Sequence, residues 1–202
     1  MLVLLIVIFK KNLMEKFFQT VAQFTNISQE SKQDLSGALK RFEFEKGKIL
    51  VKPYSVCNYL YFVEEGLTRT FYYKNEKDIT DWISAENSFA VSLISFITRK
   101  PDRRGIELLE PSIIYALHHD ELESLCIKHH DIENFVRRLV SFGLIQVSEK
   151  FDALHFETAL QRYQTLMKNT PALLQRVPLG MIASYLGITQ ETLSRMRAKI
   201  SF

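Results

Sequence analysis

The sequence has few of the residues that build disulfide, redox or metal sites. Its two cysteines, Cys57 and Cys126, stand far apart and show no CxxC spacing. A disulfide framework or an iron–sulfur site needs more thiols or a tighter cluster, so we expect free thiols in a reducing cytoplasm. His118 and His119 are adjacent, and on a strand they would point to opposite faces. We therefore expect solvated histidines and neither a metal nor another cofactor.

Patterns of catalytic residues are also lacking. The chain shows no nucleophile–base pair, no glycine-rich phosphate loop and no pair of carboxylates suited to acid–base catalysis. Ser92 and Ser95 lack the flanking residues of a nucleophile elbow. We expect that the protein is not an enzyme, although a metal-dependent β-roll enzyme of cupin type stays open as an alternative.

A hydrophobic run long enough to cross a membrane is missing. Residues 2–9 are apolar, but a spanning helix needs roughly 20 such residues. Neither a basic region nor a cleavage site indicates a signal peptide. We expect no membrane partner and interpret residues 1–13 as an extension, with translation preferably beginning at Met14. If these residues are present in the protein, we expect a disordered or sticky arm.

The chain has only a small excess of positive over negative charge, with a net charge of +3. This excess is too small to indicate nucleic-acid binding by itself. Its distribution is more informative, because six Lys and Arg residues oppose only Glu157 and Glu191 from residue 156 onward. The excess positive charge is therefore concentrated in the C-terminal part, which would have to contact a duplex.

Short runs that favour strands dominate the first part of the chain. They cover residues 41–51, 59–63, 67–73, 78–84 and 105–117. Glu64-Glu65-Gly66 predicts a tight hairpin between the second and third runs, and the last run predicts a further strand pair. Together with short helices over 14–39, this spacing predicts an antiparallel double-stranded β-roll, with residues 14–130 as one sensor-like domain.

A long helix is predicted over residues 131–155. Apolar residues recur there at steps of three and four, and they are Ile132, Val136, Leu139, Gly143, Val147, Phe151 and Leu154. Such a seam on a helix longer than average can pack against a second copy in a two-fold dimer. The alternative is that the seam packs only on its own β-domain.

Residues 156–202 are predicted to form an all-helical domain, in which residues 179–200 form a helix-turn-helix. Ile182 and Leu186 give the first helix an apolar stripe, and Leu193 and Met196 do so for the second. Gly187 suits the sharp turn between the helices, and Thr189 stands at the N-cap position of the second. This second helix is expected to enter the major groove.

Polar side chains on the second helix are the candidate DNA-binding residues. The set is Thr189, Gln190, Glu191, Thr192, Ser194, Arg195, Arg197 and Lys199. We expect Gln190, Glu191, Ser194 and Arg195 to read bases. Phosphate contacts are expected from Arg197 and Lys199, with Arg176 as a further candidate.

The order of β-roll, long helix and helix-turn-helix resembles the Crp/Fnr family of bacterial transcription regulators. The most similar segments are residues 59–73, YLYFVEEGLTRTFYY, and residues 161–197. The resemblance covers nearly the whole chain from Met14 and implies a homodimer that binds double-stranded DNA, with RNA polymerase as a further partner. It also implies that Glu191 accepts from cytosine and that Arg195 contacts guanine.

The same resemblance locates an effector pocket. Members that bind cyclic nucleotides carry a Gly-Glu pair for the ribose and, further on, an arginine for the phosphate. In this chain the pair falls on Val91-Ser92 and the arginine triplet on Asp102-Arg103-Arg104, so both functional groups are missing at their places. Arg103 or Arg104 could substitute only if the loop shifts.

The sequence thus predicts an α+β, homodimeric, sequence-specific DNA-binding transcription regulator that does not respond to cyclic nucleotides. An unidentified small-molecule effector stays open. The principal alternative is a ligand-binding β-roll whose helix-turn-helix no longer binds DNA.

Overall fold

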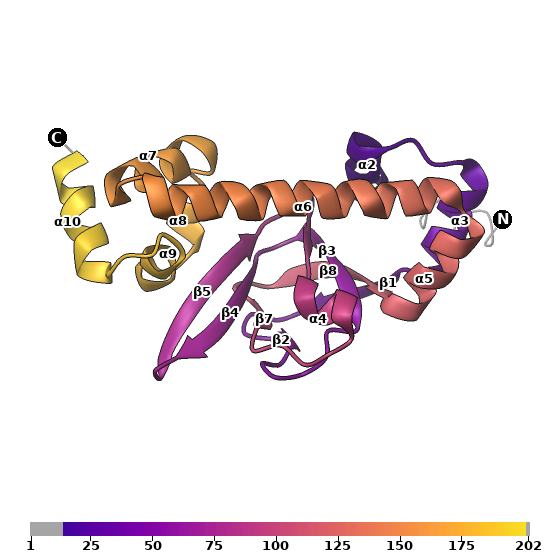
Figure 1. Cartoon of the computed structure of the whole chain (residues 1–202), viewed down its shortest axis with the longest axis horizontal. Helices are drawn as coiled ribbons and strands as arrows, with labels where there is room; N and C mark the ends of the chain where they lie inside the picture. The colour runs from indigo at the N-terminus through magenta and orange to yellow at the C-terminus, as the bar shows by residue number, and fades with distance from the viewer. Residues whose placement is uncertain (1–13, 201–202) are drawn as a thin grey trace.

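Helices and two antiparallel sheets make up the molecule, and the longest helix runs over both sheets to a helical C-terminal part (Figure 1). The computed structural model describes residues 14–200, with side chains as far as residue 198, so the predicted extension lies outside it. The strands are β1 (Lys40–Phe44), β2 (Ile49–Val51), β3 (Tyr59–Glu65), β4 (Thr68–Lys74), β5 (Lys77–Ser84), β6 (Ser88–Ala90), β7 (Gly105–Leu108) and β8 (Ser112–His118). The helices are α2 (Glu15–Phe24), α3 (Gln29–Ala38), α4 (Leu93–Thr98), α5 (His119–Lys128), α6 (His130–Phe156), α7 (Ala159–Asn169), α8 (Leu173–Arg176), α9 (Leu179–Tyr185) and α10 (Gln190–Ile200).

The first sheet has the order β1-β8-β3-β6, and the second has the order β2-β7-β4-β5. All the neighbouring strands are antiparallel. Strands β4 and β5 form a hairpin through Asn75 and Glu76, whose φ angles of 50° and 63° are positive. Two-residue hairpin loops favour such angles because they match the twist of the strands.

The predicted hairpin at Glu64-Glu65-Gly66 is wrong. Strands β3 and β4 lie in different sheets, as do β7 and β8, so the chain crosses between the sheets at both places. A Cβ on Gly66 would lie 2.1 Å from Ser112 Oγ, which shows how closely the two crossings approach each other. Leu60 to Val63 are all buried without alternation, which indicates that β3 is covered on both faces.

The main core lies between the sheets and the helices that cover the first of them. Phe17 of α2 meets Phe62 of β3 edge to face, with ring centroids 5.2 Å apart. Ile132 and Phe135 of α6 are buried in the same core. The carboxylate of Asp131 accepts hydrogen bonds from the Ser28 backbone N–H and the Ser31 hydroxyl, both at 2.6 Å. These contacts fix the first half of α6 on the β-domain.

A second core joins the C-terminal helices to the sheets. Its buried members from the helices are Tyr163, Leu166, Leu173, Val177, Ile182, Ala183, Leu186 and Leu193. Leu67 and Leu109, which lie where the chain crosses between the sheets, belong to the same cluster. The C-terminal helices therefore rest against the β-domain. Among residues 14–200, no helix is both long and apolar enough to cross a bilayer.

Candidate nucleic-acid interface

Helices α9 and α10 begin and end where the sequence spacing predicts, and Gly187 makes the turn between them. Its φ angle is +69°, and its N–H donates to the Ser184 carbonyl at 3.0 Å. Thr189 starts α10, because its hydroxyl accepts from the Thr192 N–H at 3.2 Å. This contact satisfies one of the backbone donors that a helix start leaves free.

The apolar sides of α9 and α10 pack inward. Ile182, Ala183, Leu186 and Leu193 are each at most 4% exposed. A Cβ on Gly187 would lie 2.9 Å from Leu154 Cδ2, so the turn also lies against the end of α6. The orientation of α10 is therefore set by α9 and by the long helix.

The polar side of α10 faces solvent. Glu191, Ser194 and Arg195 are exposed, as are Thr189, Gln190 and Arg197. Thr192 is partly buried, and the side chain of Lys199 lies outside the described residues. Gln190 folds back, because its Oε1 would be 2.9 Å from a Cβ on Gly180. Six of the eight predicted DNA-binding residues thus share one accessible region at the end of the molecule (Figure 1).

Glu191 is held as a carboxylate. Its own backbone N–H at the start of α10 lowers its pKa most, the Thr189 hydroxyl lowers it further, and nearby Arg195 adds a smaller effect. An ionised carboxylate can only accept hydrogen bonds. Glu191 is therefore suited to an amino group such as N4 of cytosine.

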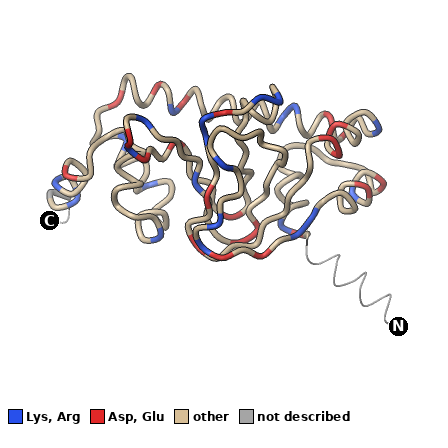
Figure 2. The backbone as a smooth tube through the Cα atoms, turned by 90° about the horizontal axis from the view of Figure 1, so that it is seen from below, with Lys and Arg blue, Asp and Glu red and all other residues tan. Residues whose placement is uncertain are grey.

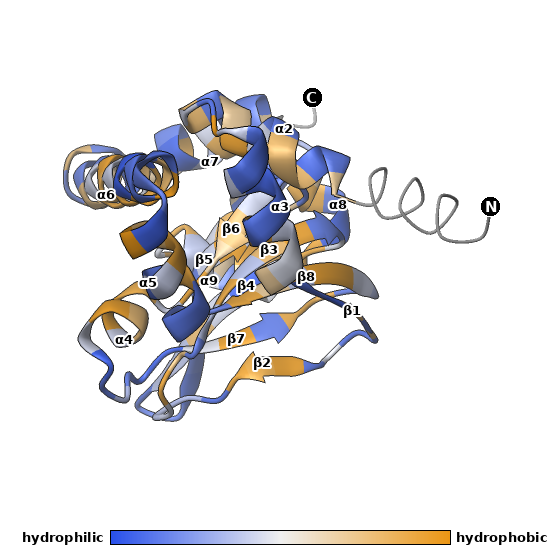
Figure 3. Ribbon diagram, turned by 90° about the vertical axis from the view of Figure 1, so that its right-hand side faces the viewer, coloured by the Kyte–Doolittle hydropathy of each residue, from blue (hydrophilic) through white to orange (hydrophobic). Residues whose placement is uncertain are grey.

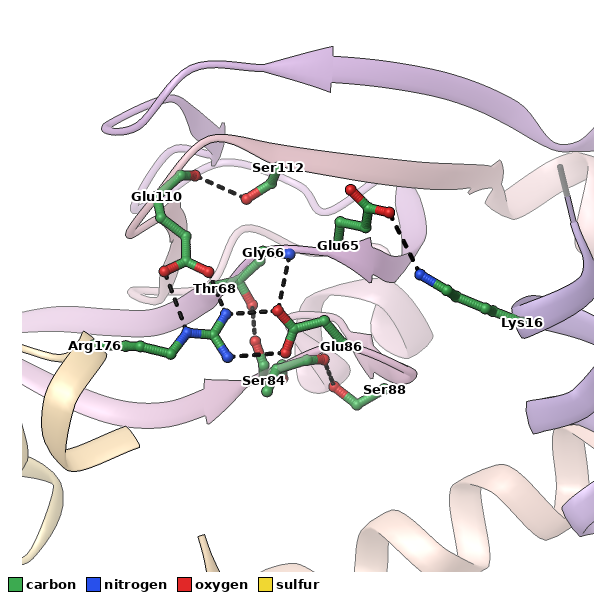
Figure 4. Close-up of polar contacts among 11 residues, drawn as sticks. Lys16, Glu65, Gly66, Thr68, Ser84, Glu86, Ser88, Glu110, Ser112 and Arg176 are labelled. Atoms are coloured by element: carbon green, nitrogen blue, oxygen red, sulfur yellow. Dashed lines mark hydrogen bonds and ion pairs between the residues drawn. The ribbon is translucent and has the colours of Figure 1, made fainter. Parts of the chain in front are cut away.

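Arg176 is placed differently from the sequence expectation. Its guanidinium makes two hydrogen bonds to Glu86, at 2.6 and 2.9 Å, and also binds the Glu110 carboxylate (Figure 4). Arg176 lowers the pKa of Glu86, and the two carboxylates raise the pKa of Arg176. Instead of facing a phosphate, Arg176 ties α8 to the β-domain across 66 and 90 positions of sequence.

The residues predicted for an effector pocket converge only in part. The buried Ser92 hydroxyl donates to Asp102 Oδ2 at 3.1 Å, and Arg104 Nη1 donates to the same oxygen at 3.2 Å. Arg104 also donates to Asp81 at 2.6 Å. Val91 is partly buried, and Arg103 is exposed, over the ring of Tyr72. The carboxylate of Asp102 thus occupies the hydrogen-bonding groups that an anionic ligand would need.

His129 is not solvated, as the sequence suggested, but buried at 8% exposure. Its Nε2 lies 2.7 Å from Asp34 Oδ2. One ligand atom each from Glu30, Asp34 and His129 could approach a single ion. However, the ammonium of Lys128 already lies 2.6 Å from Asp34 and 3.5 Å from Glu30. We interpret the group as an ion-pair network; its members are too distant in sequence to give a local signal.

The predicted seam on α6 divides into two parts. Ile132 is buried, and Val136 and Leu139 pack against the core of the β-domain. Beyond them, Val147, Phe151 and Leu154 of the predicted seam are exposed, together with Val140 and Leu144, which the prediction did not include. These five apolar residues lie at steps of four and three and are 38–66% exposed. In Figure 3, which looks along α6, the helix lies at the edge of the molecule. The second half of α6 therefore presents an uncovered heptad-like stripe.

Positions of both charge signs are interspersed along the backbone (Figure 2). The sheets carry internal ion pairs: Arg69 is 4% exposed and pairs with Asp78 and Glu107 at 2.6 and 2.7 Å. These carboxylates neutralise Arg69, and Asp81 and Asp102 pair with Arg104 in the same way. The exposed cations of α10 are therefore better suited to a polyanion than those buried in the second sheet.

Comparison with known proteins gives structural matches alone, because no family model and no curated protein sequence matches the chain. FixK2 from Bradyrhizobium japonicum is 16% identical, with a TM-score of 0.69 over 81% of this chain and 84% of that one. A putative transcriptional regulator of the Crp/Fnr family from Eubacterium rectale is also 16% identical, with a TM-score of 0.68 over 87% and 84%. The catabolite activator protein of Thermus thermophilus is 18% identical, with a TM-score of 0.56 over 88% and 85%. The chain therefore has the fold of the Crp/Fnr regulators.

Proposed function

We propose that the chain is a homodimeric, sequence-specific DNA-binding transcription regulator of the Crp/Fnr type. In this proposal residues 14–130 form the sensor-like domain, residues 131–155 connect and dimerise it, and residues 156–202 bind the duplex. The observation that carries it is the exposure of Glu191, Ser194 and Arg195 on α10 above a buried apolar side. The shared fold with a solved transcriptional regulator supports the same function.

Recognition would combine base contacts and phosphate contacts. Arg195 offers two parallel donors for the O6 and N7 atoms of guanine, and Glu191 offers an acceptor for cytosine. Ser194 lies on the same helix side and would read a neighbouring base, and Gln190 would do so after its side chain turns away from Gly180. Thr189, Arg197 and Lys199 would contact phosphate, which fixes the register of the protein without specifying sequence.

A second copy would pack on the exposed stripe of α6. Five exposed apolar side chains with heptad-like spacing offer a surface on which the same surface of a second copy would pack under two-fold symmetry. Two copies of α10 would then read half-sites about 34 Å apart, which is one turn of the duplex. RNA polymerase remains part of the proposal as a further partner.

Selection of bound sequences from a random duplex pool tests this function. We expect an enriched palindrome, and we expect log affinity for it to fall linearly with log salt, because phosphate contacts release counterions. The selection is run with and without a metabolite extract to detect an effector. Failure to enrich any sequence, together with a flat salt response, would favour the ligand-binding module that has lost DNA binding.

Cyclic nucleotides are expected not to bind. Their phosphate would have to displace the Asp102 carboxylate from Ser92 and Arg104. Calorimetric titration with cyclic AMP and cyclic GMP should give only the heat of dilution, as titration with AMP does. A saturable heat with one site per chain would contradict this part of the proposal.

A further inference from the structure

Lys150 lies where the long helix, the second sheet and the C-terminal helices meet. It belongs to α6, and its ammonium donates a hydrogen bond to the backbone carbonyl of Asp81 on β5. The same ammonium lies 4.3 Å from the ring centroid of Tyr185 on α9 and 5.5 Å from that of Trp82 on β5. One side chain of α6 therefore contacts both α9 and the strand β5 on which α9 packs.

The contacts around Lys150 fix α9 on β5. The backbone N–H of Thr80 donates to the Ser184 hydroxyl at 2.9 Å, and the rings of Trp82 and Tyr185 meet edge to face at 6.4 Å. Helix α9 in turn packs against α10. Any rotation of α9 on the sheet would carry the polar side of α10 with it.

Asp81 connects this junction to the effector-pocket position. Its carbonyl accepts from Lys150, while its carboxylate accepts from Arg104 at 2.6 Å. Arg104 also binds Asp102, which holds Ser92. A continuous set of polar contacts therefore runs from the start of α4 to α9.

We infer that Lys150 is the positioning residue that fixes α9 against β5 and thereby fixes the orientation in which α10 meets a duplex. The inference rests on the proposed DNA-binding function for its last step only. Its first step, the fixing of α9, concerns the free protein and can be measured without DNA.

The charged groups around Lys150 give this role a measurable signature. Burial lowers the pKa of Lys150 to about 8, Asp81 on β5 acts in the opposite direction, and Arg104, before β7, lowers it further. Tyr185 on α9 stays neutral in this range because burial raises its pKa. Lys150 thus loses its proton as the pH rises through about 8. Since Trp82 is the sole tryptophan of the chain, its fluorescence reports this titration.

The test compares Lys150→Met and Lys150→Arg with Lys77→Met, which removes an exposed lysine from the start of β5, the strand that Lys150 contacts. In the full-length free chain, we expect faster hydrogen exchange in α9 for Lys150→Met alone. The pH titration of Trp82 fluorescence near pH 8 should disappear in both Lys150 variants. Affinity for the selected operator should fall about 3- to 30-fold in Lys150→Met, the range between an exposed and a desolvated cation–π contact, and Arg should restore most of it.

The outcomes separate this inference from the proposed function. If no duplex is bound but exchange in α9 and the Trp82 titration depend on Lys150, the positioning of α9 stands and the DNA-binding function fails. If duplex binding is intact and Lys150→Met leaves exchange, fluorescence titration and affinity unchanged, the positioning role is overturned.

Discussion

Replacing Arg195 with alanine is expected to lower affinity for the selected operator by about 1–3 kcal/mol while changing affinity for random duplex little. Arg195 is exposed on α10 and does not support the fold. The expected loss is confined to the operator because a guanidinium that meets guanine makes two hydrogen bonds that other bases do not offer. Titration of both duplexes by fluorescence anisotropy, at one salt concentration, measures the two affinities.

Arg137→Ala is the matched control, since Arg137 is an exposed arginine on α6 that is remote from α10. This variant should retain both affinities. An equal loss on operator and random duplex in Arg195→Ala would show that Arg195 contacts phosphate and does not read a base. Repeating the selection with Arg195→Ala should relax the preference at one position of each half-site.

Replacing Val147 with glutamate is expected to convert the proposed dimer to a monomer. Val147 is 53% exposed within one chain and lies in the middle of the α6 stripe, so the substitution leaves the fold of the single chain intact. In a two-fold dimer, the two new carboxylates would be brought together and removed from water, which costs several kcal/mol. Sedimentation equilibrium should give the mass of one chain.

Operator affinity should fall with the dimer. Two linked α10 helices bind a palindrome with an advantage of about 100- to 10,000-fold over one helix, and a monomer forfeits this advantage. Glu149→Lys changes the charge two positions along the helix without entering the stripe, and it should remain a dimer. A dimeric Val147→Glu variant with full affinity would show that the copies meet elsewhere.

The helices of the candidate interface could be predicted from sequence because their signals are local. Thr158 and Gln161 form a capping box at the start of α7, and Gly187 and Thr189 mark the turn before α10. Each of these signals lies within a few residues of the boundary that it sets.

The strand partners and the long-range contacts could not be predicted in the same way. Alternation of apolar residues indicates a strand but does not name its neighbour, so β3 and β4 looked like a hairpin. The ion pairs of Arg176 and the hydrogen bond of Lys150 to Asp81 join residues that are 66 to 90 positions apart. A single sequence carries no local pattern for such pairs. The hydrogen bonds of Asp131 to Ser28 and Ser31 belong to the same class.

The Asp102 carboxylate has a consequence for how such a regulator would be controlled. The anion that binds Ser92 and Arg104 belongs to the chain itself, so the occupancy of this position does not vary with the concentration of any free anion. Output would then follow the number of molecules that the cell makes, and control would pass to synthesis and turnover. Replacing Asp102 would free Ser92 and Arg104 for an anionic metabolite. A single substitution would then separate a constitutive regulator from a ligand-dependent one.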